Sequence, residues 1–415
     1  MIVHELPGAS RIIEINSQRT IYSVLFTGHG NQVLGGGAEG LLRRWRVGDG
    51  SEDGEPIQTD WAEVFSSALS PDNRWLVCGL RYPDSSDGKA RAAVWDAQTQ
   101  EKVLDVKAHT DTVFSVDVSP DSTKFATGSA DKLAFIWCMK TGRLLVGPLE
   151  HEGVVVTVRF SPNGDRIATA TAENPDTKSV RIYESENGQQ LLDIPFRVKP
   201  RVSSPIAWSA DSCHLFAASY GEVKRFDASS GSLLGQWTVS SGSRASVVLS
   251  RNQKFAVVVA SKSVSFWDTS TQQQIGFSIH HTSDVWSIAL SPDDDCIVAG
   301  EQNGKVTFRS LRDILPVSYL TVNVSDYLAI SPNLRLDVPP FQLPFTYIYT
   351  AVLKSWTQGD LTRVEQLLTE EIAHPFHSAR ALAQRALVRS RLKEWDLAME
   401  DAKKVISHQL SSYSC

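Results

Sequence analysis

One stretch of the sequence holds residue types that could perform nucleophilic chemistry. His109, Ser129 and Asp131 lie close together along the chain, and Trp137 follows them. Serine, histidine and aspartate are the side chains of a hydrolase triad, in which the histidine activates the serine hydroxyl. The same residues could instead form a buried hydrogen-bond network, because an indole N–H inside a protein needs a partner. The elements that hold these residues decide between the two interpretations.

The sequence lacks the compact motifs of common catalytic sites. It has no GxxxxGK[ST] phosphate loop, no HExxH helix and no GxSxG turn. The glycine run Gly35–Gly37 is not followed by a predicted helix, so we expect a bulge or close packing there. The acidic run Asp293–Asp295 lies in a predicted turn and is expected to be solvated. We predict that the protein is not an enzyme, with no catalytic residue and no cofactor.

Length and composition bound the remaining classes of function. The chain has 415 residues, with 41 basic and 47 acidic side chains, so its net charge is 41 − 47 = −6. This balance argues against wholesale binding of nucleic acid or an anionic membrane, which needs a basic surface. The five cysteines stand singly, without CxxC or Cys/His spacing, which predicts reduced thiols and no metal site. No signal-peptide pattern is visible, and no apolar run approaches the ~20 residues of a membrane helix, so we expect a cytoplasmic protein, with the nucleus as the alternative.

An internal repeat decides the fold class. Each unit has an alternating apolar run that ends in Ser-Pro-Asp or a variant, followed by a second run and by a third that ends in an aromatic residue. The anchor residues that close the first run are spaced by 41–49 residues: Thr27, Ser70, Ser119, Ser161, Ser209, Ser250 and Ser291. A fourth short run precedes the next unit. Four strands in about 40–45 residues is the period of a β-propeller blade.

Residues 10–310 resemble the WD-repeat β-propeller family, and Trp95-Asp96 and Trp267-Asp268 are literal Trp-Asp pairs. The resemblance implies a mainly β fold with seven blades over residues 1–312. In that family a strand from the start of the chain completes the last blade, and this closure removes exposed sheet edges. We therefore predict that Arg11–Ile15 pairs with the strand at Lys305–Arg309.

The resemblance also favours the structural interpretation of the first cluster. Family members carry a tetrad in which a histidine joins a turn aspartate and a strand serine to the indole N–H. His109, Asp131, Ser129 and Trp137 match these positions. We therefore expect the four residues to fix strand against strand rather than to catalyse a reaction.

The tetrad is incomplete in other units. His151 and His281 remain, but their units have Tyr183 and Arg309 in the tryptophan position, and the first unit has Ser17 in place of the histidine. Blades with an intact tetrad are expected to be stiffer than the others.

A second set of residues lies five positions before each anchor, where the innermost strand of a blade opens beside the central channel. In ring order, units seven, one, two and three place four aromatic residues side by side: Trp286, Tyr22, Phe65 and Phe114. The corresponding residues of units four to six are small: Val156, Ser204 and Ala245. In WD-repeat proteins this position often meets a partner. An exposed aromatic patch typically marks an interaction site, so we predict partner binding here, against the alternative that the rings fold inward as packing.

The last hundred residues follow a different pattern. Residues 313–344 are predicted to be a proline-punctuated linker, and residues 345–415 to be helical. Two helix pairs 34 residues apart resemble tetratricopeptide repeats, with Ala386, Ala398 and Val405 at packing positions. Because such arrays normally need three or more units, we expect a truncated or incomplete array, with packing of the helices on the propeller as the alternative. The order of the two modules resembles proteins of fungal type.

Both modules predict a protein-interaction scaffold. The propeller would bind a protein or peptide at its channel mouth, and the basic face of the helical region would bind a second partner. Two alternatives stay open. One is a substrate-receptor subunit of a ubiquitin ligase, for which we see no adaptor-docking motif. The other is a chromatin- or RNA-associated propeller, for which we see neither a basic stripe nor an acidic pocket for methylated lysine.

Overall fold

The computed structural model describes the chain in ten stretches: residues 2–4, 12–17, 19–28, 30–60, 62–81, 90–172, 180–196, 198, 205–239 and 245–320. The chain divides into two compact units, Met1–Val322 and Asn323–Cys415. All of the described residues belong to the first unit. The predicted helical region, and the predicted linker beyond residue 320, lie outside them.

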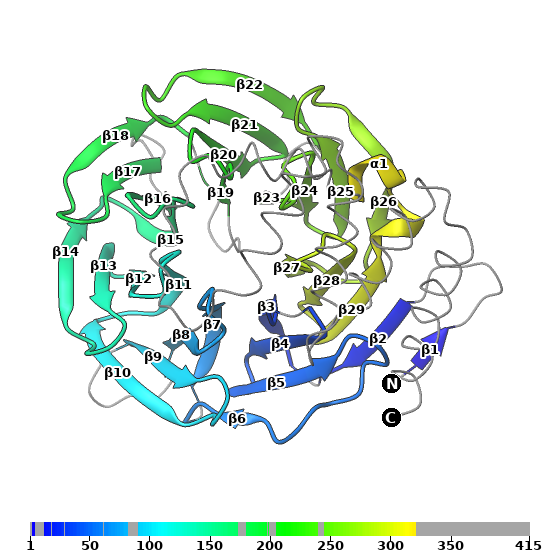
Figure 1. The fold of residues 1–415 in the computed structure, drawn as a ribbon, viewed down its shortest axis with the longest axis horizontal. Helices are drawn as coiled ribbons and strands as arrows, with labels where there is room; N and C mark the ends of the chain where they lie inside the picture. Colours follow the sequence, from blue (N-terminus) through cyan, green and yellow to red (C-terminus); the bar gives the residue numbers. More distant parts are fainter. Residues whose placement is uncertain are drawn as a thin grey trace, which may run out of the picture. The chain divides into compact units, whose positions relative to one another are not determined.

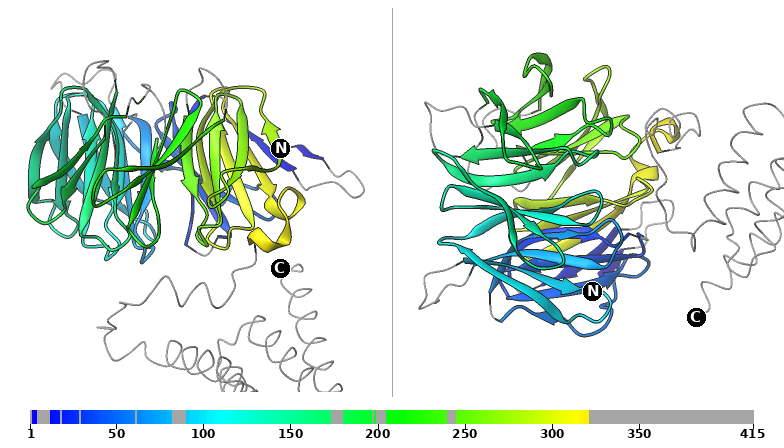
Figure 2. Two further views of the ribbon diagram at one scale, coloured as in Figure 1. Left: turned by 90° about the horizontal axis from the view of Figure 1, so that it is seen from above. Right: turned by 60° about the vertical axis from the view of Figure 1, so that its left-hand side comes forward.

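Seven antiparallel sheets stand around one axis in the described part of the chain (Figure 1). Six sheets have four strands, and the seventh has five. Seen from the side, the strands run across the thickness of the ring (Figure 2). The prediction of a seven-bladed β-propeller with four strands per repeat is therefore confirmed for this unit.

We number the blades in chain order and give the strands of each from the innermost outward. Blade one has β3 (Ile21–Phe26), β4 (Gln32–Gly37), β5 (Leu41–Arg46) and β6 (Ile57–Gln58). Blade two has β7 (Glu63–Leu69), β8 (Trp75–Arg81), β9 (Ala90–Asp96) and β10 (Lys102–His109). Blade three has β11 (Val113–Val118), β12 (Lys124–Ser129), β13 (Leu133–Cys138) and β14 (Leu144–Glu150).

Blades four to seven continue the order around the ring. Blade four has β15 (Val154–Phe160), β16 (Arg166–Ala172), β17 (Val180–Glu184) and β18 (Gln190–Ile194). Blade five has β19 (Ile206–Trp208), β20 (His214–Ser219), β21 (Glu222–Asp227) and β22 (Leu233–Thr238). Blade six has β23 (Ala245–Leu249), β24 (Phe255–Ala260), β25 (Ser263–Asp268) and β26 (Gln274–His280). Blade seven has β27 (Val285–Leu290), β28 (Cys296–Glu301), β29 (Lys305–Ser310), β2 (Ile12–Asn16) and β1 (Ile2–His4).

Blade seven joins the two ends of the propeller. β2 pairs antiparallel with β29, from Ile12 opposite Arg309 to Asn16 opposite Lys305. The predicted closure by an N-terminal strand is confirmed. The sequence did not predict β1, which pairs antiparallel with β2 and makes this blade the five-stranded one.

The Ser-Pro-Asp anchors work as hydrogen-bonded turns. In blade three the Ser119 hydroxyl donates to the Asp121 carboxylate (2.6 Å) and accepts the backbone N–H of Lys124 (2.8 Å). Ser122, between them, has a φ of +61°. The serine hydroxyl thus joins the turn aspartate to the first residue of the next strand. This contact fixes where that strand begins, which explains why the anchor recurs in the sequence.

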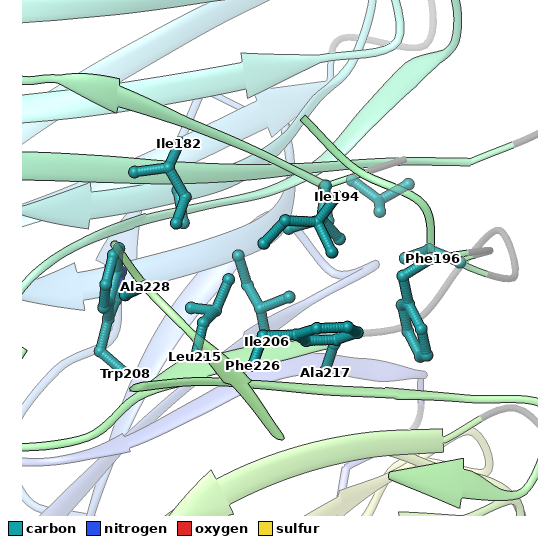
Figure 3. Close-up of a cluster of buried hydrophobic side chains, with 14 of the residues drawn as sticks. Ile182, Ile194, Phe196, Ile206, Trp208, Leu215, Ala217, Phe226 and Ala228 are labelled. Atoms are coloured by element: carbon teal, nitrogen blue, oxygen red, sulfur yellow. The ribbon is translucent and has the colours of Figure 1, made fainter. Parts of the chain in front are cut away.

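The hydrophobic core lies between neighbouring blades. One cluster packs blade four against blade five and includes Ile182, Ile194, Ile206, Trp208 and Phe226 (Figure 3). Because a blade packs on both of its faces, the second strands are buried throughout, as in β24, where all six residues are buried. This is why such strands show continuous apolar runs instead of alternation.

The glycine run of blade one is closely packed, as expected. A Cβ on Gly35 would lie 2.4 Å from the Trp45 ring, and one on Gly36 would lie 2.7 Å from Val64 of blade two. No side chain larger than hydrogen fits at either position.

A segment after blade seven, residues 311–320, folds back onto blade six, and we call it the strap. It contains η1 (Leu311–Asp313) and α1 (Val317–Leu320), which lies beside β25 and β26 (Figure 1). Leu311, Ile314, Leu315 and Leu320 are buried in one cluster with blade six. The residues that are buried with blade six therefore extend to Leu320.

Polar contacts fix the strap in place. The Tyr319 hydroxyl donates to Asp268 (2.7 Å), and the Asn252 amide donates to the Tyr319 carbonyl (2.6 Å). Gly276 of β26 has a φ of +62°, and a Cβ there would lie 2.6 Å from the Ile314 carbonyl oxygen. Glycine at this position allows the close approach of the strap.

Two further expectations concern thiols and membrane helices. Cys78, Cys138, Cys213 and Cys296 are free thiols in the structure, and Cys415 lies outside the described residues. No helix in the described stretches has the length and apolar character to cross a membrane.

Candidate functional site

Three residues of the predicted tetrad lie in blade three, and the fourth, His109, lies at the end of the outermost strand of blade two. His109 ends β10, and Asp131 lies in the turn between β12 and β13, which carries Trp137. The His109 Nδ1 lies 2.9 Å from the Asp131 carboxylate, and its Nε2 lies 2.8 Å from the Thr127 hydroxyl. The Trp137 indole N–H donates to the same hydroxyl (3.0 Å). One network thus joins the outer strand of blade two to two strands of blade three.

The hydroxyl in this network belongs to Thr127, which corrects the assignment of Ser129. Ser129 donates to the carbonyl of Asp111 (2.8 Å) and accepts the backbone N–H of Asp131 (3.1 Å). In a strand, Thr127 and Ser129 share a face, and only the more central Thr127 lies between the histidine and the indole. Ser129 instead fastens the turn that carries Asp131.

The network is built for rigidity and not for catalysis. Thr127 is completely buried, and the side chains of His109 and Asp131 are 2% and 5% exposed. Burial disfavours the ionised carboxyl of Asp131, but hydrogen bonds from His109 and from two backbone N–H groups hold its pKa below the usual value. An ionised carboxylate can accept the Nδ1–H of His109, and the other ring nitrogen faces the Thr127 hydroxyl. No substrate could reach an enclosed threonine, so the hydrolase interpretation has no geometric support.

Blade four repeats the network with different end groups. The His151 Nε2 lies 2.8 Å from the Thr169 hydroxyl and 3.3 Å from the Tyr183 hydroxyl, while Nδ1 donates to the Leu149 carbonyl (3.0 Å). Burial, with a contribution from the nearby Arg181 charge, lowers the pKa of His151 to about 4. The ring is therefore neutral at pH 7.

The sequence contained a signal for the threonines. Thr127 and Thr169 occupy the same register position in the second strand, and the units that carry them also carry His109 and His151. The unit with His281 has alanine at that position, and its histidine contacts Glu301 instead (3.0 Å). A hydroxyl paired with a histidine, rather than the serine alone, identifies the network.

The four predicted aromatic residues form a continuous chain of contacts, which we call the aromatic arc. Tyr22 and Phe65 are stacked, with ring centroids 4.6 Å apart and planes 12° apart. Trp286 packs edge-on against Tyr22 at 5.4 Å, and Phe114 packs edge-on against Phe65 at 5.3 Å. The structure thus brings together all four residues in the predicted order, from blade seven to blade three.

The arc lies at one end of a central channel of about 960 Å³, whose lining includes Tyr22, Phe65 and Phe114. All four rings are half-buried: neither enclosed in the core nor fully exposed. Opposite the arc, Val156 and Ala245 are 5% and 1% exposed and belong to inter-blade core clusters. Ser204, the third small residue, lies outside the described residues. At this register position, the described residues are aromatic in blades seven, one, two and three and small in blades four and six.

A series of inter-blade hydrogen bonds supports the inner strands below the arc. In each bond a hydroxyl of one inner strand accepts a backbone N–H of the next. Moving from blade seven to blade four, the pairs are Ser287 with Val24 (3.0 Å), Ser23 with Ser67 (3.0 Å), Ser66 with Val116 (3.1 Å) and Ser115 with Val158 (3.1 Å). We call these bonds the hydroxyl ladder. They hold in register the strands that carry the arc, so the arc is a preorganised surface.

The comparisons with known proteins agree with the blade geometry. The family model described as "WD domain, G-beta repeat" matches residues 100–138 and 272–308. These residues lie in blades two and three and in blades six and seven. The ring is a WD40-repeat propeller.

Three curated proteins are similar to this chain at low identity. Rat apoptotic protease-activating factor 1 is 27% identical over 246 residues, which are 57% of this chain and 18% of that protein. The Dictyostelium discoideum periodic tryptophan protein 2 homolog is 25% identical over 265 residues, 59% of this chain and 26% of that protein. The chicken serine-threonine kinase receptor-associated protein is 24% identical over 244 residues, 59% of this chain and 65% of that protein. The matches thus span less than two thirds of each relative.

The described part of the WD40 propeller offers no group of histidine, cysteine and carboxylate side chains that could hold a metal ion. Its cysteines are spread over different blades, and burial raises the pKa of Cys78 and of Cys296, the latter to about 11. The aromatic arc is a surface of the propeller to which four blades each contribute one ring.

Proposed function

We propose that this protein is a non-enzymatic interaction scaffold whose propeller binds a protein segment or peptide at the aromatic arc. The observation that carries the proposal is the unbroken chain of four ring contacts at the channel mouth, with every ring partly open to solvent. Aromatic side chains offer large apolar areas with few rotatable bonds and are enriched at the centres of protein interfaces. WD40 propellers are typically protein-interaction scaffolds and usually non-enzymatic, which supports the same class.

The geometry limits what the partner presents. A channel of about 960 Å³ admits side chains from an extended segment, whereas a folded domain would rest on the rim. The arc covers only the side formed by blades seven, one, two and three. The partner segment is therefore expected to place an apolar or aromatic side chain against Tyr22 and Phe65, between the edge-on rings.

The proposal gives the predicted helical region a second role. Residues 345–415 would bind another partner or tether the propeller in an assembly, as tetratricopeptide-like arrays do. We place this scaffold in the cytoplasm, with the nucleus as the alternative.

The test compares full-length variants in affinity capture from native extract, read by quantitative mass spectrometry. Phe114→Ala with Trp286→Ala removes the two end rings, each of which has one ring contact within the arc. The matched control, Leu144→Ala with Leu191→Ala, removes exposed apolar side chains from outer strands, where each is 41% exposed. The expected result is a partner lost from the arc variant and retained by the control.

A partner retained by the arc variant, or lost equally from the control, would contradict the proposal. A large drop in the melting temperature of the arc variant would instead identify the rings as core packing. The role of the helical region is tested with a chain that ends after Leu320, because a shorter form would remove Leu311, Ile314 and Leu315 from the core.

A further inference from the structure

The outer rim of the propeller carries most of its exposed apolar side chains. Of the eight large hydrophobic side chains that are exposed in the described residues, seven lie on the outermost strands of blades two to six. They are Val103, Leu144, Leu145, Leu191, Leu233, Leu234 and Phe277. Each outermost strand also has an edge whose backbone groups can pair with another strand.

Most of these edges carry a feature that discourages pairing. β10 has Lys102, Asp105 and Lys107, β14 has Pro148 and Glu150, and β18 has Asp193. β6 is only two residues long, and β2 is already covered by β1. Charges, proline and short length are the usual protections of an edge strand.

The only ionisable residue of β26 is His280, but the strand is irregular. Its ladder is irregular between Val264 and Phe266 of the partner strand, and Gly276 has a positive φ. The strap approaches it there, with the Ile314 carbonyl 2.6 Å from where a Cβ of Gly276 would lie. An incoming strand could not follow β26 along its length.

β22 has no charge, no proline and, among the described residues, no covering strand, and its ladder with β21 is irregular only near its start, where the register shifts between Leu233 and Gly235. Its sequence is LLGQWT, six residues long. Leu233 and Leu234 are 50% and 44% exposed. From Gly235 to Thr238 it pairs regularly with β21, so its free edge is regular over the same residues.

β22 differs from β10 and β18 in the residue that it carries at one register position. Gln236 lies opposite the third residue of β21, Lys224. Asp105 of β10 lies opposite Ala93, and Asp193 of β18 lies opposite Arg181, at the same register position of their blades. Blades two and four thus carry a carboxylate where blade five carries a neutral, exposed amide.

We infer that a second copy of this chain docks on the outer edge of blade five, with the two β22 strands paired antiparallel about a twofold axis. An antiparallel pair of identical strands is self-complementary, and a twofold dimer is the commonest symmetric assembly. In such a pair, residues near the strand centre lie close to their own copies, so a central charge would face its like. Gln236 is near that centre and is uncharged, which favours a second copy over a partner of opposite charge. β1 on β2 shows that a blade of this ring accepts a fifth antiparallel strand.

The dimer is expected to be weak. Two six-residue strands and four exposed leucines bury much less than the roughly 1,200–2,000 Å² of a stable interface. Association should therefore appear as a concentration-dependent equilibrium in the micromolar range and not as a permanent dimer.

The test is sedimentation velocity of the full chain between about 1 and 100 µM, where weak complexes populate both states. Gln236→Asp gives blade five the edge charge of blades two and four, and it should weaken the dimer about tenfold or more. Gln190→Asp is the matched control, because it makes the same change at an exposed position on β18. Hydrogen exchange of β22 amides, measured at both ends of the concentration range, locates the interface.

The expected result is a monomer–dimer equilibrium that Gln236→Asp shifts and Gln190→Asp does not, with β22 amides protected at high concentration. A chain that stays monomeric at 100 µM would overturn the inference. A dimer that both variants retain, or one that leaves β22 amides unprotected, would place the interface elsewhere and also overturn it.

Discussion

The exchange of Thr127 for valine tests the assignment of the network hydroxyl most directly. Valine keeps the shape of the side chain and removes the one oxygen that His109 and Trp137 share, at 2.8 Å and 3.0 Å. Both partners are nearly enclosed, with 2% and 5% of their surface exposed, so water cannot replace the lost contacts. Each buried polar group that is left without a hydrogen-bond partner lowers the free energy of unfolding by about 1–3 kcal/mol. The added methyl group returns about 1 kcal/mol, so we expect a net loss of about 3 kcal/mol.

The measurement is hydrogen exchange of the amides in β12 and β13 of the full chain. A chain with two compact units does not unfold in a single step, so a local readout is preferable to one global transition. A loss of about 3 kcal/mol corresponds to exchange about 100-fold faster in blade three. Blade six, which has a separate contact between Trp267 and Ser265 (2.8 Å), serves as the internal reference.

The control is Ser129→Ala. It removes two bonds, one to the carbonyl of Asp111, an exposed residue, and one from the backbone N–H of Asp131, so the expected loss is about 1–2 kcal/mol. If the serine variant loosened blade three more than the threonine variant, the serine would be the bridging residue. Equal, small effects would show that the network contributes little to blade stability.

Three other outcomes follow from the structure. Because burial lowers the pKa of His151 to about 4, below the ~6.5 of an unfolded chain, the unfolded state binds the proton first as the pH falls. The stability of blade four, measured by hydrogen exchange of β16 amides corrected for the intrinsic exchange rate, should thus decline from pH 6.5 towards pH 4, by up to about 3 kcal/mol, and His151→Gln should flatten the profile. Leu315→Ala should cost about 2–3 kcal/mol, since this leucine of the strap is 3% exposed against blade six, and should speed amide exchange in β24 and β26. Ser115→Ala leaves the Val158 N–H without its hydroxyl partner, and should raise exchange in β15 while β23 is unchanged.

The sequence predicted the ring well because each blade repeats its own local instructions. The Ser-Pro-Asp turn, or its variant, marks the same position in every unit, because the serine hydroxyl bonds within the turn. The number of these anchors then gives the number of blades. The closing strand was also predictable, because Arg11–Ile15 has the pattern of a fourth strand without the three that precede it. The structure pairs Ile12–Asn16 with β29.

The contacts between blades were harder to predict. The error at Ser129 arose because the family pattern names a serine, whereas geometry selects the residue two positions earlier on the same strand face. The part of the strap beyond residue 312 was assigned to a linker because its apolar residues, such as Ile314 and Leu315, show no helical or strand period over so short a segment. Their burial depends on blade six, which lies about 60 residues earlier in the sequence, and no local pattern records that contact.

The aromatic arc was predicted in order and proximity, but not in its support. Ring order follows from the repeat: the four residues share one register position in four consecutive blades, and blade seven meets blade one. The hydroxyl ladder depends on single serines whose neighbours in the sequence give no sign of their partner blade. It runs from blade seven to blade four and so passes beneath all four rings. Because those strands are fixed to one another before any partner arrives, little ordering of the arc accompanies binding, and the affinity of a bound segment should depend on its own flexibility more than on that of the propeller.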